Sequence, residues 1–380
     1  MILFSVLADD HIILSANRSS AAEFTFYVGT YTYGKSEGIY ICSMDTISGA
    51  IHLKGVKKDV TNPSFLTIDH NNRFLYAVNE IYETEGKSGG SVSAFRINQK
   101  TDTLEFLNKQ PSAGAAPCHL SIDKNDRFVL VSNYTSGNVA ILPVLENGSL
   151  GAPIEVVQHE GSSITPKRQQ GPHAHSTTLD TSNHYAYVAD LGIDKVMIYK
   201  FDNKFGKLCP SDKPFIQVAP GAGPRHFVFH LDGKKAYLIN ELNSTLTAFD
   251  YDAKTGDLSE TQSISTLPSD FTGENACADL HISSSGRYVY GSNRGHDSIV
   301  VFAVDESNGE LSVIQHQSSL GKTPRTFAID PTGRFLLVAN QNSDTIVVFA
   351  IDSQTGKLSF IGYELKIPTP VCVRFKLPHA

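Results

Sequence analysis

The chain has 380 residues, of which 41% are hydrophobic and 19% are charged, and its formal net charge is −7. This composition is that of a globular protein. Because the chain is acidic overall and has no long run of Lys and Arg, nucleic acid and anionic membrane surfaces are not expected as partners. The five cysteines are widely spread and form no CxxC pair, which argues against a disulfide framework or a cysteine zinc site.

Residues 1–22 are interpreted as an N-terminal extension. They begin with an apolar run, and residues 20–22 resemble a cleavage site, but no basic residue precedes the run and residues 9–11 interrupt it. A signal peptide needs a basic start and a continuous apolar core, and a transmembrane helix needs a longer apolar run than any in this chain. We therefore expect residues 23–380 to form one domain in the cytoplasm. A periplasmic or secreted location is the alternative if residues 1–22 are the remnant of a signal.

A repeat of about 50 residues organises the rest of the chain. Each copy has Pro or a small residue, then apolar positions ending in Asp, a Gly- or Asn-containing turn, and a β-rich run that ends in Asn or Asp. Two further runs of alternating apolar residues follow, joined by turns such as Thr-Gly. The full copies of the first half of this unit span residues 63–79, 117–133, 174–190, 224–240, 277–293 and 324–340.

The runs are short, alternate with period two and are rich in Val, Ile, Phe, Tyr and Thr, which is typical of strands. Four strands in each unit of this length predict a β-propeller blade. A seventh unit is split, because residues 26–30 and 38–42 match the second and third strands and residues 370–375 supply the first. The sequence therefore predicts an all-β fold, a seven-bladed β-propeller of four-stranded antiparallel blades. The N- and C-terminal strands pair in one blade and close the ring.

Two positions of the repeat should meet at one mouth of the central channel, because the first strand of a blade begins on the face where the second strand ends. Binding sites usually lie on such loop-lined surfaces. These positions vary in chemistry while the scaffold stays constant, as expected for ligand contacts. The first is occupied by Ser64, Cys118, His175, Arg225, Ala278, Arg325 and Val371. The second, directly after the repeat Asn, is occupied by Glu80, Tyr134, Leu191, Glu241, Arg294 and Gln341. The Asn residues themselves are expected to be structural.

Cationic and imidazole side chains gather at these positions and beside them. They are His173, His175, Arg225, His226, Arg294, His296 and Arg325, together with the carboxylate of Glu241. Arginines that lie close together repel one another and are costly to desolvate, so the set favours an anionic ligand. Glu80 is a second candidate carboxylate, but it precedes a long loop and is ranked lower.

His173 and His175 are two residues apart on an expected strand, so they should point to the same side and could hold a metal. No third or fourth ligand is evident, and no GxGxxG, P-loop, HExxH or GxSxG motif is present. We therefore expect neither a metal nor another cofactor.

At these residues the chain resembles the seven-bladed propeller lactonases, which include the bacterial propeller-type 6-phosphogluconolactonases and the fungal carboxymuconate cyclase. The resemblance implies a site built from a His, two Arg and a Glu, here His173 or His175, Arg225, Arg294 and Glu241. The motifs that carry it are YVGTY at 27–31, GPHAH at 171–175, DLG at 190–192, GPRH at 223–226, NELN at 240–243, SNRGHDS at 292–298 and TPR at 323–325.

The expected activity is hydrolysis of a small anionic lactone, 6-phosphogluconolactone above others. Lactone hydrolysis needs a general base, stabilisation of an oxyanion and anchors for the substrate. Glu241, His173 or His175 would activate water, and Arg225 would stabilise the oxyanion or hold a carboxylate. Arg294 and Arg325 would bind an anionic substituent, and His226 and His296 are further candidates for binding the substrate. One alternative is a muconate-cyclising lyase or isomerase that uses the same groups, and another is a non-catalytic propeller that binds a small anion or a protein. The oligomeric state stays open.

Overall fold

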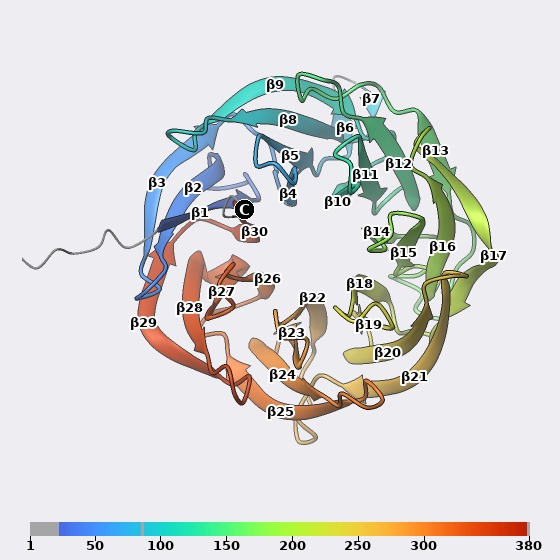
Figure 1. The fold of residues 1–380 in the computed structure, drawn as a ribbon, viewed down its shortest axis with the longest axis vertical. Coiled ribbons are helices and arrows are strands. Elements are labelled where there is room, and N and C mark those ends of the chain that lie inside the picture. The colour runs from blue at the N-terminus through green and yellow to red at the C-terminus, as the bar shows by residue number, and fades with distance from the viewer. Residues whose placement is uncertain (1–22, 85–86, 378–380) are drawn as a thin grey trace, which may run out of the picture.

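The computed structural model describes residues 23–84 and 87–377, which form a closed ring of seven four-stranded antiparallel sheets (Figure 1). The predicted fold class is therefore confirmed. The N-terminal extension proposed for residues 1–22 lies outside the described residues. Within each blade the four strands lie side by side in order from the centre of the ring to its rim. The innermost strands are β4, β10, β14, β18, β22, β26 and β30.

The strands follow one another in chain order within every blade but the first. Blade 1 contains β30 (Pro370–Phe375), β1 (Glu23–Thr30), β2 (Gly38–Asp45) and β3 (Ile51–Lys58); blade 2 contains β4 (Leu66–Ile68), β5 (Phe74–Asn79), β8 (Ser91–Ile97) and β9 (Leu104–Pro111). Blade 3 contains β10 (Pro117–Ile122), β11 (Phe128–Asn133), β12 (Asn138–Pro143) and β13 (Glu155–Gln158); blade 4 contains β14 (Ala174–Leu179), β15 (Tyr185–Asp190), β16 (Lys195–Asp202) and β17 (Lys207–Gln217).

Blades 5 to 7 repeat this arrangement. Blade 5 contains β18 (Pro224–Phe229), β19 (Lys235–Asn240), β20 (Thr245–Asp252) and β21 (Asp257–Ser265); blade 6 contains β22 (Ala276–Ile282), β23 (Tyr288–Arg294), β24 (Ser298–Val304) and β25 (Leu311–Ser318). Blade 7 contains β26 (Pro324–Ile329), β27 (Phe335–Asn340), β28 (Thr345–Ile351) and β29 (Leu358–Lys366). A short hairpin of β6 (Glu83–Thr84) and β7 (Lys87–Ser88) and a 3₁₀ turn, η1 (Gln341–Ser343), lie in loops.

The ring closes in blade 1, where β30 pairs antiparallel with β1 and places Val373 opposite Val28. This pairing confirms the predicted split blade and leaves β1 no free inner edge. Side-chain hydrogen bonds near one end of the β30–β1 pair add to this closure. Asp102, from the β8–β9 turn of blade 2, accepts hydrogen bonds from Thr25 Oγ1 at 2.5 Å and from Lys376 Nζ at 2.7 Å.

The core lies between the blades, where apolar side chains of neighbouring sheets interdigitate. Five fully buried tyrosines cross these interfaces, and each donates its hydroxyl to a carbonyl in the outer hairpin of the next blade. The bonds are Tyr27 to Asp102 O, Tyr76 to Gly148 O, Tyr187 to Gly256 O, Tyr237 to Gly309 O and Tyr290 to Gly356 O, at 2.7–3.1 Å. Leu130 and Leu337 occupy the same position in blades 3 and 7.

Four of the five repeat Asn residues tie successive blades together, whereas Asn240 bonds Thr245 and Thr247 within its own blade. Asn79, Asn133, Asn293 and Asn340 each donate Nδ2 to a backbone carbonyl that follows the outer strand of the preceding blade. These amides satisfy backbone acceptors that would otherwise be buried without a partner. Their structural role is as predicted, and the positions beside them are free to serve a ligand.

Candidate active site

The two variable positions of the repeat meet at one end of the channel, as predicted, and line a pocket of about 360 Å³. The first position contributes Cys118, His175 and Arg325, and the second contributes Glu80, Tyr134, Glu241 and Arg294. The other lining residues are Tyr31, Tyr82, Ala116, Arg168 and Ala276. Six blades, 2 to 7, thus supply side chains to one small space through the same two strand ends.

Glu241 is the electrostatic centre of the pocket. Its Oε2 lies 3.0 Å from Arg225 Nε and 2.8 Å from Arg294 Nη2, and its Oε1 lies 2.5 Å from Arg168 Nη2. Burial alone would raise the pKa of Glu241, but Arg294, Arg225 and Arg168 outweigh it and hold that pKa well below its usual range. The carboxylate stays ionised with both oxygens occupied, so it is a poor proton acceptor.

Arg225 and Arg294 are both anchored by backbone carbonyls as well as by Glu241. Arg225 donates Nη1 to Ala278 O, and Arg294 donates Nε to Ala276 O and Nη2 to Cys277 O. Arg225 is only 2% exposed and does not line the pocket. Burial, followed by the charges of Arg294 and Arg325, lowers the pKa of Arg225 to about 10, so its guanidinium is still charged at neutral pH.

Arg168 is a site residue that reasoning from the repeat missed. It lies in the connection between β13 and β14, outside the repeated positions, and also donates Nη2 to Tyr134 Oη at 3.1 Å. The next residue, Gln169, holds the connection in place through a bond from Nε2 to Asp194 Oδ1 at 2.7 Å. The length of the β13–β14 connection could have pointed to Arg168. A connection from an outer strand to the next inner strand ends at the mouth where the site lies, so a long one can bring side chains into the site.

The structure separates the two histidines that the sequence left as alternatives. His175 is in β14 and lines the pocket, whereas His173 precedes the strand and does not. The His173 ring stacks on Tyr134 at 4.5 Å and donates Nδ1 to Tyr134 O at 2.9 Å. His173 lies before the strand, and a register irregularity between Ala174 and Ser176 interrupts the regular alternation on which the expectation for the two rings was based.

His175 is a neutral imidazole inside the pocket wall. It is 5% exposed, and within the described residues its Nε2 has no hydrogen-bond partner. Burial, and then the charge of Arg225, holds the pKa of His175 well below its usual value. Cys118 lies beside it with Sγ 3.9 Å from Nδ1, and burial raises the pKa of Cys118 so that it remains a thiol. Across the described ranges, no group of His, Cys, Asp and Glu is arranged to hold a metal ion.

The opposite wall carries Arg325, Tyr31 and Glu80. Glu80 Oε2 accepts hydrogen bonds from Tyr31 Oη at 3.0 Å and Ser64 Oγ at 2.5 Å, which places this lower-ranked carboxyl group in the site. The Arg325 guanidinium lies 5.3 Å from the centre of the Tyr31 ring. Among the described residues it has no ion pair and no hydrogen bond, in contrast to the other three arginines.

The remaining candidates lie away from the pocket lining. His226 is buried next to Arg225 and bonds Asp279 through Nδ1 at 2.7 Å. His296 packs edge-on against Phe271 and bonds Ser298 Oγ through Nδ1 at 2.7 Å. Of the predicted site residues, the structure places His175, Glu241, Arg294 and Arg325 in the lining. The other four, predicted to contact substrate, are not among the lining residues: His173, Arg225, His226 and His296.

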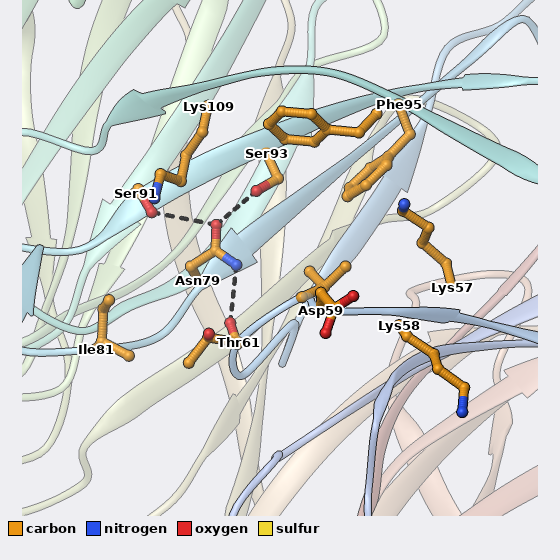
Figure 2. Close-up of a pocket in the computed structure, with 12 residues that line it drawn as sticks. Lys57, Lys58, Asp59, Thr61, Asn79, Ile81, Ser91, Ser93, Phe95 and Lys109 are labelled. Carbon is orange, nitrogen blue, oxygen red and sulfur yellow. Dashed lines mark hydrogen bonds between the residues drawn. The ribbon is translucent and has the colours of Figure 1, made fainter.

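A second pocket of about 310 Å³ lies between blades 1 and 2 (Figure 2). Its walls come from β3, β5, β8 and β9 and include Phe95, Phe106 and Lys57. In Figure 2 the amide of Asn79 bridges Thr61 O and the hydroxyls of Ser91 and Ser93, which is the structural bond of the repeat. None of the predicted site residues lines this pocket, so the channel pocket is the candidate active site.

The fold is thus a ring of seven blades that carries a cationic pocket at one channel mouth. Residues 25–375 match the family described as "Lactonase, 7-bladed beta-propeller", and the chain belongs to this family. It is 40% identical over 349 residues to the 6-phosphogluconolactonase of Bacillus subtilis, covering 92% of this chain and 97% of the relative. It is 38% identical to the 6-phosphogluconolactonase of Formosa agariphila, covering 80% of this chain and 86% of the relative.

Solved structures agree with this assignment. The periplasmic gluconolactonase PpgL of Pseudomonas aeruginosa superposes with a TM-score of 0.89 at 35% identity, covering 94% of this chain and 100% of the other. Across the described part of the present chain, no helix has the length and apolarity needed to span a bilayer.

Proposed function

We propose that the protein hydrolyses 6-phosphogluconolactone to 6-phosphogluconate. The observation that carries the proposal is the guanidinium of Arg325, which has no ion pair or hydrogen bond to the described residues, in a pocket that also holds the neutral imidazole of His175. Four arginines face the two carboxyl groups of Glu80 and Glu241, so positive charge is in excess. A phosphate on the substrate matches this excess and would form bidentate bonds with Arg325. Relatives with the name 6-phosphogluconolactonase support the same substrate.

His175 is the proposed general base. Its Nε2 lone pair takes a proton from a water molecule as the water oxygen attacks the lactone carbonyl. The tetrahedral intermediate then collapses, the bond from the carbonyl carbon to the ring oxygen breaks, and the imidazolium returns its proton to that oxygen. The anionic substrate offsets part of the field of Arg225 and Arg325, which strengthens His175 as a base at the moment it is needed.

Arg294 is the proposed stabiliser of the oxyanion, because it lines the pocket and Glu241 and two carbonyls fix its orientation. Preorganised donors of this kind typically contribute 10²–10³-fold in rate. Glu241 then serves to hold three guanidinium groups together rather than to accept a proton.

The test is the rate of acid release from 6-phosphogluconolactone by the purified chain, measured against spontaneous hydrolysis, with Glu241→Gln and Arg225→Ala beside the wild type. Acceleration by the wild type that both variants abolish supports the proposal. Absence of acceleration by a folded preparation would refute this substrate, and unphosphorylated gluconolactone and muconates would then be assayed in the same format.

A further inference from the structure

A buried chain of polar groups runs from behind the pocket into blade 6. Asp279, on β22, is 4% exposed, and its Oδ1 lies 2.7 Å from His226 Nδ1. On the other side of the ring, His226 Nε2 lies 3.3 Å from Arg225 Nη1. Arg225 then reaches Glu241 through Nε at 3.0 Å. Four side chains from blades 5 and 6 are therefore linked in series, and only Glu241 lines the pocket.

The chemistry of the groups fixes the direction of every bond in this series. An ionised carboxylate only accepts, and a guanidinium only donates. His226 must therefore carry its proton on Nδ1 and present the Nε2 lone pair to Arg225. Burial and the Arg225 charge lower the pKa of His226 to about 4, and the histidines His281 and His226 hold the pKa of Asp279 well below its usual range against the effect of burial. Both groups thus have the required protonation at neutral pH.

Asp279 is itself fixed by more than His226. Its Oδ2 accepts bonds from Thr326 Oγ1 at 2.5 Å, Phe327 N at 3.2 Å and His281 Nε2 at 3.1 Å. These partners come from β22 and β26, so the carboxylate is held between blades 6 and 7. A group held in this way can orient a ring without being displaced by it.

We propose that Asp279 and His226 are positioning residues that set the orientation of Arg225 and, through it, of the Glu241 carboxylate. The expectation that His226 contacts substrate is replaced by a role one layer behind the pocket, since its ring does not line the site. The inference deepens the proposed lactonase function and depends on it for its kinetic arm.

The first experiment needs no substrate. Nitrogen-15 NMR of histidine-labelled wild-type protein reports which ring nitrogen of His226 is protonated, with His226→Gln used to assign the signal. We expect the Nδ1–H tautomer in the wild type and loss of that preference in Asp279→Asn, whose amide can donate. An Nε2–H tautomer in the wild type would overturn the proposal, whatever the lactonase assay shows.

The second experiment compares variants by kcat and KM for 6-phosphogluconolactone. Misplacement of catalytic groups by about 1 Å costs on the order of 100-fold, so we expect Asp279→Asn and His226→Leu to lower kcat about 10- to 100-fold with little change in KM. His226→Gln should keep most of the activity, because a glutamine amide also offers one donor and one acceptor. Asp123→Asn is the matched control, a fully buried carboxylate in the β10–β11 turn of blade 3.

The His226 pair keeps the proposal falsifiable if Asp279→Asn does not fold. Equal activity of folded His226→Leu and His226→Gln would refute the positioning role. If the wild type has the Nδ1–H tautomer but no lactonase activity, the proposed function fails while the arrangement of the buried series stands.

Discussion

Arg225 and Arg325 occupy the same position of the repeat in blades 5 and 7, yet within the part of the chain that the structure describes Arg225 is ion-paired and Arg325 is not. The second position of its own blade is Glu241, whose Oε2 lies 3.0 Å from Arg225 Nε. In blade 7 the second position is Gln341, which carries no charge, and the Arg325 guanidinium lies over the Tyr31 ring instead. A uniform scaffold thus produces one structural arginine and one that is available to a ligand.

Replacing Arg325 with Gln should weaken use of the phosphorylated substrate selectively. A charge-assisted hydrogen bond contributes roughly 1.5–3 kcal/mol, so we expect kcat/KM for 6-phosphogluconolactone to fall about 10- to 100-fold, mainly through KM. Gluconolactone without phosphate should be affected much less. Arg334→Gln is the control, because Arg334 also lies over an aromatic ring, Phe335, but at an exposed turn. Equal losses for both lactones would contradict the role of Arg325 as phosphate anchor.

His175→Gln should lower kcat by about 10²–10⁴-fold, the usual range for a general base. His173→Gln, two residues away, should stay within a few-fold of the wild type, because the His173 ring lies against Tyr134 outside the pocket. Initial rates at saturating lactone measure kcat for both variants and the wild type. If the two substitutions were equally damaging, the assignment of the base to His175 would be wrong.

Acidification below about pH 6.5 should destabilise the fold through buried histidines. Burial lowers the pKa of His119, His175 and His226, so these groups stay neutral in the native state while they bind protons in the unfolded state. Their contribution to the free energy of unfolding is fully present above the pKa of histidine in the unfolded state. It is lost as the pH falls from that value toward the lower pKa of the native state. Each proton taken up only on unfolding lowers the free energy of unfolding by about 1.4 kcal/mol per pH unit.

Urea unfolding between pH 7 and 5 measures this slope. His119→Phe removes one of the three groups but keeps an aromatic ring against Phe65, whose ring centre lies 4.3 Å from that of His119. The slope of the free energy of unfolding against pH should fall by up to the amount that corresponds to one bound proton. His52→Phe, at an exposed histidine, is the control. A slope that is the same in His119→Phe and the wild type would show that His119 titrates alike in both states.

Tyr237→Phe should lower the free energy of unfolding by about 1 kcal/mol, because it removes the bond from the hydroxyl to Gly309 O and leaves a buried carbonyl without that donor. Leu130 and Leu337 show that blades 3 and 7 fold without this bond, so the variant should still close its ring. Tyr33→Phe, at a tyrosine that is 59% exposed, is the control. A smaller effect at Tyr237 than at Tyr33 would rule out the inter-blade bond as a source of stability.

The fold was predictable because its information is repeated. Strands that alternate with period two and a recurring Asn predict the four-stranded blade. The single strand at 370–375, which has no blade of its own, predicts that the ring closes with the N-terminal strands. The site was predictable as far as it follows the repeat, since register alone brings His175, Glu241, Arg294 and Arg325 to one mouth.

The rest depends on geometry that register does not encode. Arg168 lies in an irregular connection, and only the bond from Gln169 to Asp194 shows how that connection is held. The choice between His173 and His175 depends on a local irregularity in β14. Whether an arginine is paired or available depends on the residue across the strand pair, as Arg225 and Arg325 demonstrate.

The pairing of β30 with β1 also governs how the protein can be made. The inner neighbour of β1 is encoded far downstream of β1 itself, so a nascent chain holds an incomplete blade until residues 370–375 have left the ribosome. At usual elongation rates that interval is on the order of tens of seconds. During translation the inner edge of β1 has an unpaired row of backbone groups, which invites pairing with another nascent chain. A chain that ends before residue 370 would therefore be an open ring prone to misassembly.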